Sequence, residues 1–337
     1  MAQNLGKKSE HRTVINEELM IKNSDYTIIG IDGGGTHTRG VLFQKGKIVA
    51  QAEAGTSRIH TVGVGESCDR TLNIIIDLCR QAEIETSEVD ATVVGLAGVW
   101  LEEEKLRAAN LLRTLARSNR VVINDLAVVS DAEIAFEGAL GDNDGIIVIV
   151  GTGSIGLARI GKNHFYRCGG WGIELDDEGS GAWIGKEALT AIVRELDGRG
   201  PSTKMTQALA NKVKSIDLKN PRTIVKSYAD GSFVYSELSP IVMDLAEKGD
   251  ELALDIINRA SIHLTELPLT LAKHFKTKKI KVALMGGIIH NNTLLSQKIF
   301  DQLSKDKRFE VQLSNDDVAT WGAISLGLKM IEESKEL

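Results

Sequence analysis

The amino-acid sequence predicts an α/β fold made of two structurally related halves. Segments with the periodicity of strands and of helices follow one another along the chain, which is typical of α/β layers. In addition, one local pattern occurs twice, beginning near Tyr26 and near Gly145: an apolar strand, a turn of glycine and threonine, a second strand, a second turn and a third strand. The repeated unit is short, so chance similarity is the alternative explanation.

The first copy begins with residues 26–31, a short apolar run rich in β-branched side chains, which predicts a buried strand. The run ends at Asp32 and three glycines. Residues 40–44 and 47–53 then alternate around Lys45-Gly46, which predicts a hairpin. In the second copy we expect three strands in the same order: residues 145–150, 155–160 and 164–168.

Hydrophobic spacing predicts the remaining elements. Helices are expected at residues 67–82, 103–117, 185–196, 251–273 and 294–303. Strands are expected at residues 92–96, 121–123 and 280–285. The expected domains are a tail at 1–24, an N-terminal lobe at 25–135 that residues 322–337 rejoin, and a C-terminal lobe at 136–321.

Bulk properties restrict the classes of function. The chain has 337 residues, 42% of them hydrophobic and 26% charged, and a net charge of −6. This composition is typical of a globular protein. The negative net charge argues against binding to nucleic acid, which requires a basic surface. No apolar run reaches the length of a membrane span, and charges throughout residues 1–24 argue against a signal peptide. The three cysteines form no zinc or disulfide pattern, so we expect a reduced, cytoplasmic protein.

The segment from Asp32 to Thr36 is the first candidate for binding chemistry. Gly33, Gly34 and Gly35 let the backbone turn tightly and present N–H groups to an anion. Thr36 adds a hydroxyl donor, and Asp32 is a hard oxygen ligand suited to Mg²⁺, directly or through water. The spacing is neither the Walker pattern nor the dinucleotide-binding one, since a strand follows. The alternative is an ordinary hairpin turn.

A second turn of this kind lies between two strands and consists of Gly151, Thr152, Gly153 and Ser154. Such turns are common by themselves. Because the two turns stand at equivalent positions of the repeated unit, we expect them to bind a polyphosphate from both lobes. Gly286 and Gly287, between a strand and a helix, allow close approach of a flat ring such as adenine.

Asp125 directly follows Asn124 and the expected strand at 121–123. A carboxylate at the carboxyl end of a buried strand points to the crevice where α/β proteins bind ligands. Phosphoryl transfer to a hydroxyl needs a group that accepts the hydroxyl proton, and Asp125 is the candidate. The alternative is an N-cap for a helix at 126–134.

Residues 168–183 combine two glycine pairs, an indole ring and three adjacent carboxylates. A hydroxylated ligand is bound by carboxylates, backbone donors and an apolar ring face, and this segment supplies all three. We expect Asp177 to contact such a ligand. The alternative is a glycine loop followed by a helix that residues 176–180 cap.

The ordered set of motifs resembles the BadF/BadG/BcrA/BcrD-type ATPase family of the actin-like, ribonuclease H-like superfamily, and within it the N-acetylglucosamine kinase branch. The resemblance covers residues 26–327 and depends on the order Asp-Gly-Gly-Gly-Thr, Asn-Asp, Gly-Thr-Gly-Ser, Gly-Gly-Trp-Gly and Asp-Glu-Gly-Ser. It implies two lobes with duplicated βββαβαβα halves. It also implies a kinase that uses ATP and Mg²⁺ to phosphorylate an amino sugar, N-acetylglucosamine above all, at the 6-hydroxyl. Closure of the lobes over sugar and MgATP would exclude water.

The resemblance further implies roles for individual residues. The two glycine turns would bind the phosphates of ATP, Gly286 and Gly287 would back the adenosine, and Asp125 would be the catalytic base. The residues implied at the sugar are Ser57, Arg58, Gly169, Gly170, Trp171 and Asp177. Trp321 would belong to a helix that returns to the first lobe. A homodimer is compatible with the resemblance.

Arg58 departs from the family pattern, in which an asparagine is expected in this region. Its guanidinium either faces solvent or contacts an acidic sugar such as N-acetylmuramic acid, whose carboxylate suits the guanidinium fork. Glucosamine is a further alternative substrate.

Two other functions stay open at this point. Some members of the family couple ATP hydrolysis to electron transfer through an iron–sulfur cluster and activate acyl-CoA reductases or dehydratases. Cys168 lies beside Gly169 as such a cluster would require, but no second cysteine accompanies it. A sugar sensor without catalysis would need a DNA-binding head, for which the 24 residues of the tail are too few.

Overall fold

The computed structural model describes residues 25–161, 164–291, 293–315 and 317–336. The expected tail at residues 1–24 lies outside the described residues. The chain forms two compact units. Unit 1 extends to Asn143 and resumes at Ser314, and unit 2 consists of Asp144–Leu313.

Unit 1 contains a five-stranded sheet in the order β3-β2-β1-β4-β5. Its strands are β1 (Ile28–Gly33), β2 (His37–Gln44), β3 (Lys47–Gly55), β4 (Ala91–Leu96) and β5 (Asp125–Ser130). β2 is antiparallel to both β1 and β3, whereas β1, β4 and β5 are parallel. The hairpin between β2 and β3 turns at Lys45 and Gly46, whose φ angles are 52° and 76°, as the sequence predicts for a two-residue turn.

Unit 2 repeats this arrangement with the strand order β10-β9-β6-β7-β8. Its strands are β6 (Gly145–Val150), β7 (Ser154–Ile160), β8 (His164–Gly169), β9 (Ile280–Met285) and β10 (Phe309–Leu313). Three antiparallel strands again precede two that run parallel to the first. β6 and β9 have the bounds that the sequence predicts. The duplicated βββαβαβα halves are therefore confirmed.

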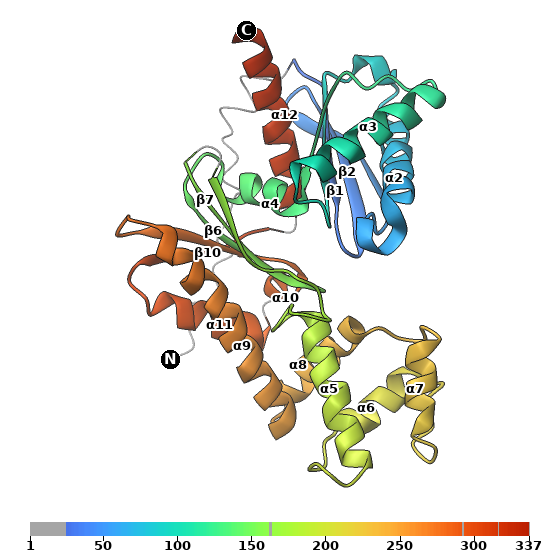
Figure 1. Ribbon diagram of the computed structural model, residues 1–337, viewed down its shortest axis with the longest axis vertical. Helices are drawn as coiled ribbons and strands as arrows, with labels where there is room; N and C mark the ends of the chain where they lie inside the picture. Colours follow the sequence, from blue (N-terminus) through green and yellow to red (C-terminus); the bar gives the residue numbers. More distant parts are fainter. Residues whose placement is uncertain (1–24, 162–163, 292, 316, 337) are drawn as a thin grey trace. The chain divides into compact units, whose positions relative to one another are not determined.

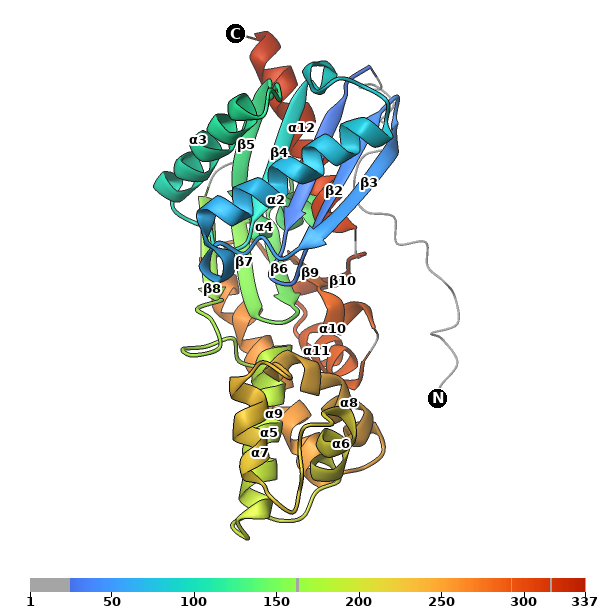
Figure 2. The same ribbon diagram turned by 90° about the vertical axis from the view of Figure 1, so that its right-hand side faces the viewer.

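Helices α2 (Ile59–Gln81) and α3 (Glu102–Ser118) cover one face of the sheet of unit 1, as Figure 2 shows. Leu72 and Leu112 belong to the core that these helices form with the sheet. α2 begins at Ile59 rather than at residue 67. Gly63, with φ 80° and ψ 157°, interrupts its first turns, so the hydrophobic spacing becomes regular only after this residue.

Helices α4 (Asp131–Leu140) and α12 (Val318–Glu336) lie against the other face of this sheet (Figure 2). They touch through backbone atoms: a Cβ at Gly138 would lie 1.8 Å from the carbonyl oxygen of Val318, and one at Gly322 would lie 1.8 Å from that of Ile134. The lobe boundaries expected after residues 135 and 321 fall inside these two helices, which both belong to unit 1.

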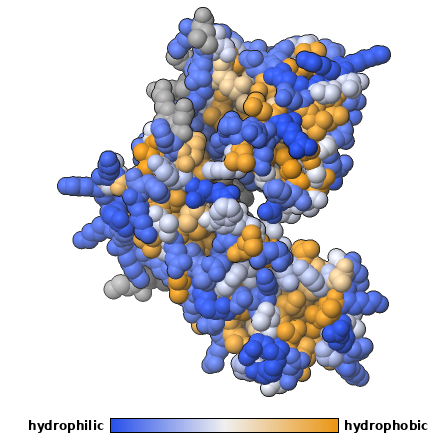
Figure 3. All heavy atoms as spheres, viewed as in Figure 1, coloured by the Kyte–Doolittle hydropathy of each residue, from blue (hydrophilic) through white to orange (hydrophobic). Residues whose placement is uncertain are grey.

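Unit 2 differs from unit 1 by a long helical insertion between β8 and β9 (Figure 1). The α-helices of the insertion are α5 (Gly181–Leu196), α6 (Met205–Lys212), α7 (Arg222–Ala229), α8 (Ser239–Glu247) and α9 (Glu251–Leu271). After β9, unit 2 continues with α10 (Gly287–His290) and α11 (Leu294–Ser304). Figure 3 shows apolar side chains at the surface over α6 and α7, where Val225 and Val234 are 53% and 51% exposed. Within the described residues, none of the helices combines the length and the apolar character that a membrane crossing requires.

Candidate active site

The carboxyl ends of the parallel strands meet at one edge of the sheet of unit 1. Gly33 is paired with Leu96, and Leu96 with Ser130. β3 ends at the same edge, because Gly55 is the partner of His37 at the start of β2. The loops after β1, β3, β4 and β5 therefore lie together, at the kind of edge where α/β proteins bind ligands.

The turn between β1 and β2 consists of Gly34, Gly35 and Thr36. The N–H of Gly34 donates to the carbonyl of His37 (3.0 Å), and the hydroxyl of Thr56 donates to the carbonyl of Gly34 (3.0 Å). A Cβ at Gly35 would meet no atom within 4 Å, so the backbone here is open to a ligand. A fixed turn with accessible backbone is the geometry that suits an anion.

Asp125 lies at the opposite edge of this sheet, which contradicts the prediction that it follows a strand. Residues 121–123 form no strand; β5 begins at Asp125 and ends at Ser130. Asp125 is exposed and paired with Ala91, the first residue of β4. The β-branched run at 121–123 favoured a buried strand, but Val122 is 46% exposed. Asp125 is therefore remote from the carboxyl edge where Asp32 lies.

Asp131 is the carboxylate that follows β5, as the first residue of α4. Ser130 caps this helix: its hydroxyl accepts from the N–H of Glu133 (3.1 Å), and the Glu133 carboxylate accepts from the N–H of Ser130 (2.7 Å). The helix replaces the one expected at 126–134. Gly95 provides the space, because a Cβ there would lie 3.3 Å from the Cα of Asp131. Sequence reasoning missed Asp131, although the Ser-x-x-Glu pattern marks the start of its helix.

The electrostatics of Asp32 and Asp131 are coupled. Burial, and next the negative charge of Asp131, raise the pKa of Asp32 from 3.8 to about 7, while Arg39 acts in the opposite direction. Burial also raises the pKa of Asp131. Two interactions act in the opposite direction: the N–H of Ala132 donates to the carboxylate (2.9 Å), and Arg58 contributes a positive charge. Because each carboxylate is hard to ionise here, the pair favours the uptake of a proton or a cation.

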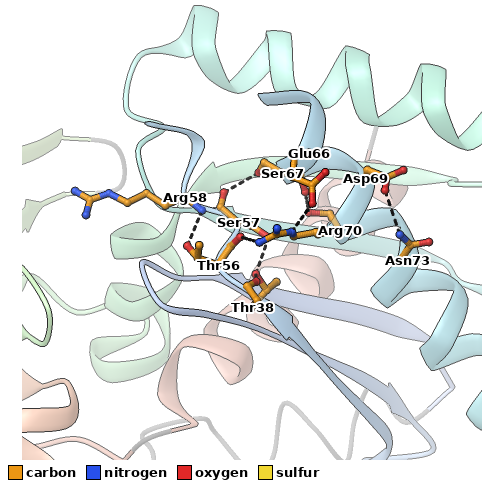
Figure 4. A network of polar contacts seen from close by, with 11 residues as sticks. Thr38, Thr56, Ser57, Arg58, Glu66, Ser67, Asp69, Arg70 and Asn73 are labelled. Carbon is orange, nitrogen blue, oxygen red and sulfur yellow. Dashed lines mark hydrogen bonds and ion pairs between the residues drawn. The ribbon is translucent and has the colours of Figure 1, made fainter. Parts of the chain in front are cut away.

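The loop between β3 and α2 carries two of the residues implied at the sugar. The Ser57 side chain is fully buried, with its hydroxyl 2.6 Å from that of Thr38, so it is not available to a ligand and the predicted contact is not supported. Arg58 is partly exposed, and its side chain extends away from the polar network around Ser57 and Arg70 (Figure 4). The geometry therefore keeps Arg58 as a candidate and removes Ser57.

In unit 2 the strands β6 and β9 also end at a common edge, because Ile149 is paired with Met285. Gly286 follows β9 with φ 101°, and a Cβ there would lie 2.4 Å from the carbonyl oxygen of Val150. Only glycine fits this contact. It holds the backbone of Gly286 and Gly287 beside the end of β6, where the second glycine turn begins.

The second glycine turn is joined to the N-terminus of α5. The N–H of Gly151 donates to the carbonyl of Gly153 (2.9 Å) and closes the turn. The N–H groups of Gly181 and Ala182 donate to the carbonyls of Gly151 (2.9 Å) and Thr152 (3.0 Å). The positive end of the α5 dipole therefore points toward the turn, which favours negative charge there.

The loop that follows β8 exposes an aromatic ring. Gly169 and Gly170 have φ angles of 76° and 75°, which turn the chain sharply after the strand. Trp171 is 66% exposed, and the guanidinium of Arg167 lies 4.1 Å from the centroid of its ring. The N–H of Trp171 donates to a carboxylate oxygen of Asp176 (3.3 Å). The loop thus presents an indole face together with a cation.

Asp177 connects this loop to the second glycine turn. It is buried, has the left-handed φ of 53° and accepts from the N–H of Gly172 (3.2 Å). A Cβ at Gly153 would lie 2.7 Å from its carboxylate. Left-handed backbone at a buried aspartate stores strain, which is typical of functional positions. The structure therefore places Asp177 beside the turn that the sequence predicts for phosphate.

The donor set restricts the metals that could bind. Among the described residues, no group of three or more histidines, cysteines, aspartates or glutamates could form a metal cage. Asp32 and Asp131 fit an Mg²⁺ that arrives with phosphates, because such an ion takes one or two carboxylates and keeps waters. An iron–sulfur cluster fits poorly: Cys68 and Cys79 are buried in α2, and burial raises the pKa of each to about 11.

The paired βββαβαβα halves, each with a glycine turn after its first strand, define an ATPase of the actin-like fold class. The chain belongs to the BadF/BadG/BcrA/BcrD ATPase family, whose model matches residues 29–314.

Relatives within this class are sugar kinases. The chain is 29% identical over 306 residues to the N-acetylmuramic acid/N-acetylglucosamine kinase of Clostridium acetobutylicum, which covers 88% of this chain and 96% of that relative. It is 30% identical over 292 residues to the N-acetyl-D-glucosamine kinase of Dictyostelium discoideum, and the match covers 82% of this chain and 88% of that relative. A candidate N-acetylglucosamine kinase of Chromobacterium violaceum has a similar structure, with a TM-score of 0.70 and 27% sequence identity. The match covers 90% of this chain and 99% of that protein.

Proposed function

We propose that this protein is an ATP-dependent kinase that phosphorylates an amino sugar of the N-acetylglucosamine type at its 6-hydroxyl. The observation that carries the proposal is the pair Asp32 and Asp131 at the carboxyl edge of one sheet, beside an accessible glycine turn. The names of the relatives in Clostridium and Dictyostelium support the choice of sugar.

Asp131 is the catalytic base in this proposal and replaces Asp125. Its carboxylate accepts the proton of the sugar hydroxyl as the hydroxyl oxygen attacks the γ-phosphorus of ATP, and ADP leaves. Burial raises the pKa of Asp131, which makes it a stronger base once it is ionised. The position of Asp131 as the first residue of a capped helix fixes its backbone.

The proposed phosphate-binding residues are those of the two glycine turns: Gly33, Gly34, Gly35 and Thr36 in the first, and Gly151, Thr152, Gly153 and Ser154 in the second. Gly286 and Gly287 approach the adenosine. Asp32 would hold Mg²⁺ together with the phosphates, and the ion would supply neutralisation of the charge that develops during transfer.

In this proposal the sugar contacts Gly169, Gly170 and Trp171, and the exposed indole offers an apolar face to the sugar ring. The sequence also predicts Asp177 at the sugar, but Asp177 is buried and accepts from the N–H of Gly172, so, as for Ser57, a direct contact is not supported and its role is to hold the loop. The sparse cysteines and the charge of −6 support a cytoplasmic enzyme that acts on a small molecule rather than on nucleic acid. A homodimer stays an expectation.

The proposal is tested by ADP release in a coupled assay with MgATP. The acceptors are N-acetylglucosamine, N-acetylmuramic acid, glucosamine, N-acetylmannosamine and glucose. We expect an N-acetylated amino sugar to give the highest kcat/KM. If none of the five stimulates ADP release above the rate with water alone, the kinase assignment is wrong. Iron content after anaerobic purification then tests the electron-transfer alternative.

A further inference from the structure

The loop between β3 and α2 holds the backbone of Arg58 in one place. The Ser57 carbonyl accepts from the hydroxyl of Ser67 (2.7 Å), and the guanidinium of Arg70 donates to the carbonyl of Thr56. The N–H of Ile59 donates to the carbonyl of Ala97 in the loop after β4 (3.1 Å). These bonds fix the chain on both sides of Arg58 without using its guanidinium (Figure 4).

The guanidinium of Arg58 forms no close ion pair in the part of the chain that the structure describes. No carboxylate oxygen of that part lies within 4.0 Å of its nitrogens, although other arginines of unit 1, such as Arg39 and Arg70, form such pairs. The side chain is only partly exposed, so it is less well solvated than a free surface arginine. A partly buried cation without such a pair favours an anionic group from a ligand.

The residue after Arg58, Ile59, is bonded to Ala97 just after β4, the strand beside β5, which Asp131 follows. Burial raises the pKa of Asp131 and the positive charge of Arg58 acts in the opposite direction, whereas Arg39 is the cation that acts on Asp32. Asp131 is the proposed partner of the acceptor hydroxyl, and Asp32 belongs to the phosphate turn. The acceptor sugar is therefore a nearer source of an anion for Arg58 than the nucleotide.

We propose that Arg58 determines acceptor specificity by binding a carboxylate carried by the sugar, while the sugar hydroxyl is held at Asp131. The inference rests on the proposed function and adds a substrate class to it, namely amino sugars with an acidic substituent. A guanidinium matches a carboxylate with two parallel hydrogen bonds, which adds geometric selectivity to the charge.

The test compares three acceptors on three proteins. The acceptors are N-acetylglucosamine, N-acetylmuramic acid and the carboxamide of N-acetylmuramic acid, which keeps the shape and removes the charge. The proteins are the wild type, Arg58→Gln and the control Arg117→Gln, which removes an exposed arginine from the last turn of α3. Ratios of kcat/KM within one protein cancel any loss of stability.

We expect Arg58→Gln to lower kcat/KM for N-acetylmuramic acid about tenfold to a hundredfold, the effect of one lost charge-assisted hydrogen-bond pair. The carboxamide and N-acetylglucosamine should change little, and Arg117→Gln should resemble the wild type with all three. An equal fall for all three acceptors would overturn the inference, because Arg58 would then act on Asp131 or on the phosphoryl group. Unchanged ratios would overturn it as well.

A binding experiment separates this inference from the kinase assignment. Calorimetric titration of N-acetylmuramic acid and its carboxamide into wild type and Arg58→Gln needs no turnover. Selective loss of affinity for the charged ligand in Arg58→Gln supports the inference even if no acceptor is phosphorylated. Equal affinities in the two proteins, or no binding to the wild type, overturn it even if N-acetylglucosamine is a good substrate.

Discussion

Burial, and next the negative charge of Asp131, raise the pKa of Asp32, so the carboxylate near the end of β1 is hard to ionise beside the one that follows β5 at the same edge of the sheet. Both groups are also deprived of water by burial. A divalent cation or a transferred proton relieves this repulsion. This edge therefore suits the proposed function, in which Mg²⁺ arrives with the nucleotide and a proton arrives from the acceptor.

The first prediction distinguishes the two candidate bases. Asp131→Asn should lower kcat about 10²–10⁴-fold, because the positioned proton acceptor is lost. Asp125→Asn, at the exposed opposite edge of the same sheet, should keep nearly full turnover. Steady-state kinetics with the best acceptor measures both, and calorimetry with MgATP checks that the nucleotide still binds. A turnover of more than a tenth in Asp131→Asn would remove it as the base.

The second prediction concerns stability and pH. The folded protein holds a proton on Asp32 up to about pH 7, whereas the unfolded chain releases it near the ordinary value of 3.8. The folded state thus binds more protons between these values, so this group costs stability as pH rises from about 4 to 7, and the full cost persists above 7. Asp32→Asn should therefore gain stability over the wild type, by at most about 4 kcal/mol.

Urea denaturation of the ligand-free proteins across this pH range measures the gain. The difference in unfolding free energy should grow with pH and become constant above about pH 7. A difference that is constant throughout would show that Asp32 ionises in the folded state like an ordinary aspartate, and one that shrinks as pH rises would show that folding lowers its pKa; either result contradicts the prediction.

The third prediction tests the glycine turns. Gly35→Ala and Gly151→Ala should leave stability unchanged, because a Cβ at either position would meet no atom within 4 Å. Nucleotide affinity should fall about tenfold or more, since the methyl group occupies the space in which phosphate oxygens approach the backbone. Gly65→Ala, an equally open position in α2, is the control and should bind MgATP normally. Normal affinity in all three variants would leave both turns as plain hairpin connections.

The fourth prediction concerns the contact between α4 and α12. Lys329 forms ion pairs with Glu137 and Asp142 at 2.6 Å each, and Glu137, with 2% of its side chain exposed, also accepts from the hydroxyl of Ser325 (2.8 Å). Lys329→Met leaves a buried carboxylate without its cation. Because Lys329 is itself 27% exposed, we expect a loss of about 2 kcal/mol, below the roughly 3–5 kcal/mol of a fully buried pair.

Thermal or urea unfolding measures this loss, and Lys212→Met, which removes an exposed lysine from the last turn of α6, is the control. Adding Glu137→Met to Lys329→Met should recover part of the stability, because no uncompensated charge is then buried. A double variant less stable than Lys329→Met alone would contradict this explanation of the pair.

The sequence predicted the glycine-punctuated strands well and β5 poorly, for a physical reason. β6 combines β-branched residues with a glycine turn, so local composition and tertiary structure agree. The run at 121–123 has the same composition but forms no strand and exposes Val122, whereas the real strand, Asp125–Ser130, begins with a charge. The capping box of Ser130 and Glu133 was the local signal that could have placed the end of β5 and, with it, Asp131.

Other features of the site depend on contacts between distant residues and are invisible to local patterns. The burial of Ser57 follows from Thr38, which is 19 positions away in sequence. The direction of Arg58 follows from Arg70 and Ala97, which fix the loop around it. The backbone contact of Gly138 with α12 joins segments almost two hundred positions apart. Composition and periodicity carry no information about such pairings.

The exposed ring of Trp171 gives the molecule a natural optical probe. Trp100, Trp183 and Trp321 are less exposed than Trp171, so the long-wavelength part of the tryptophan emission comes chiefly from this loop. The guanidinium of Arg167 lies over its ring, so a molecule that settles on the indole must change both its hydration and its charged neighbour. Occupation of the loop after β8 should therefore shift the emission spectrum, so the binding of the acceptor that we propose for this loop can be followed in real time without a label or a coupled enzyme.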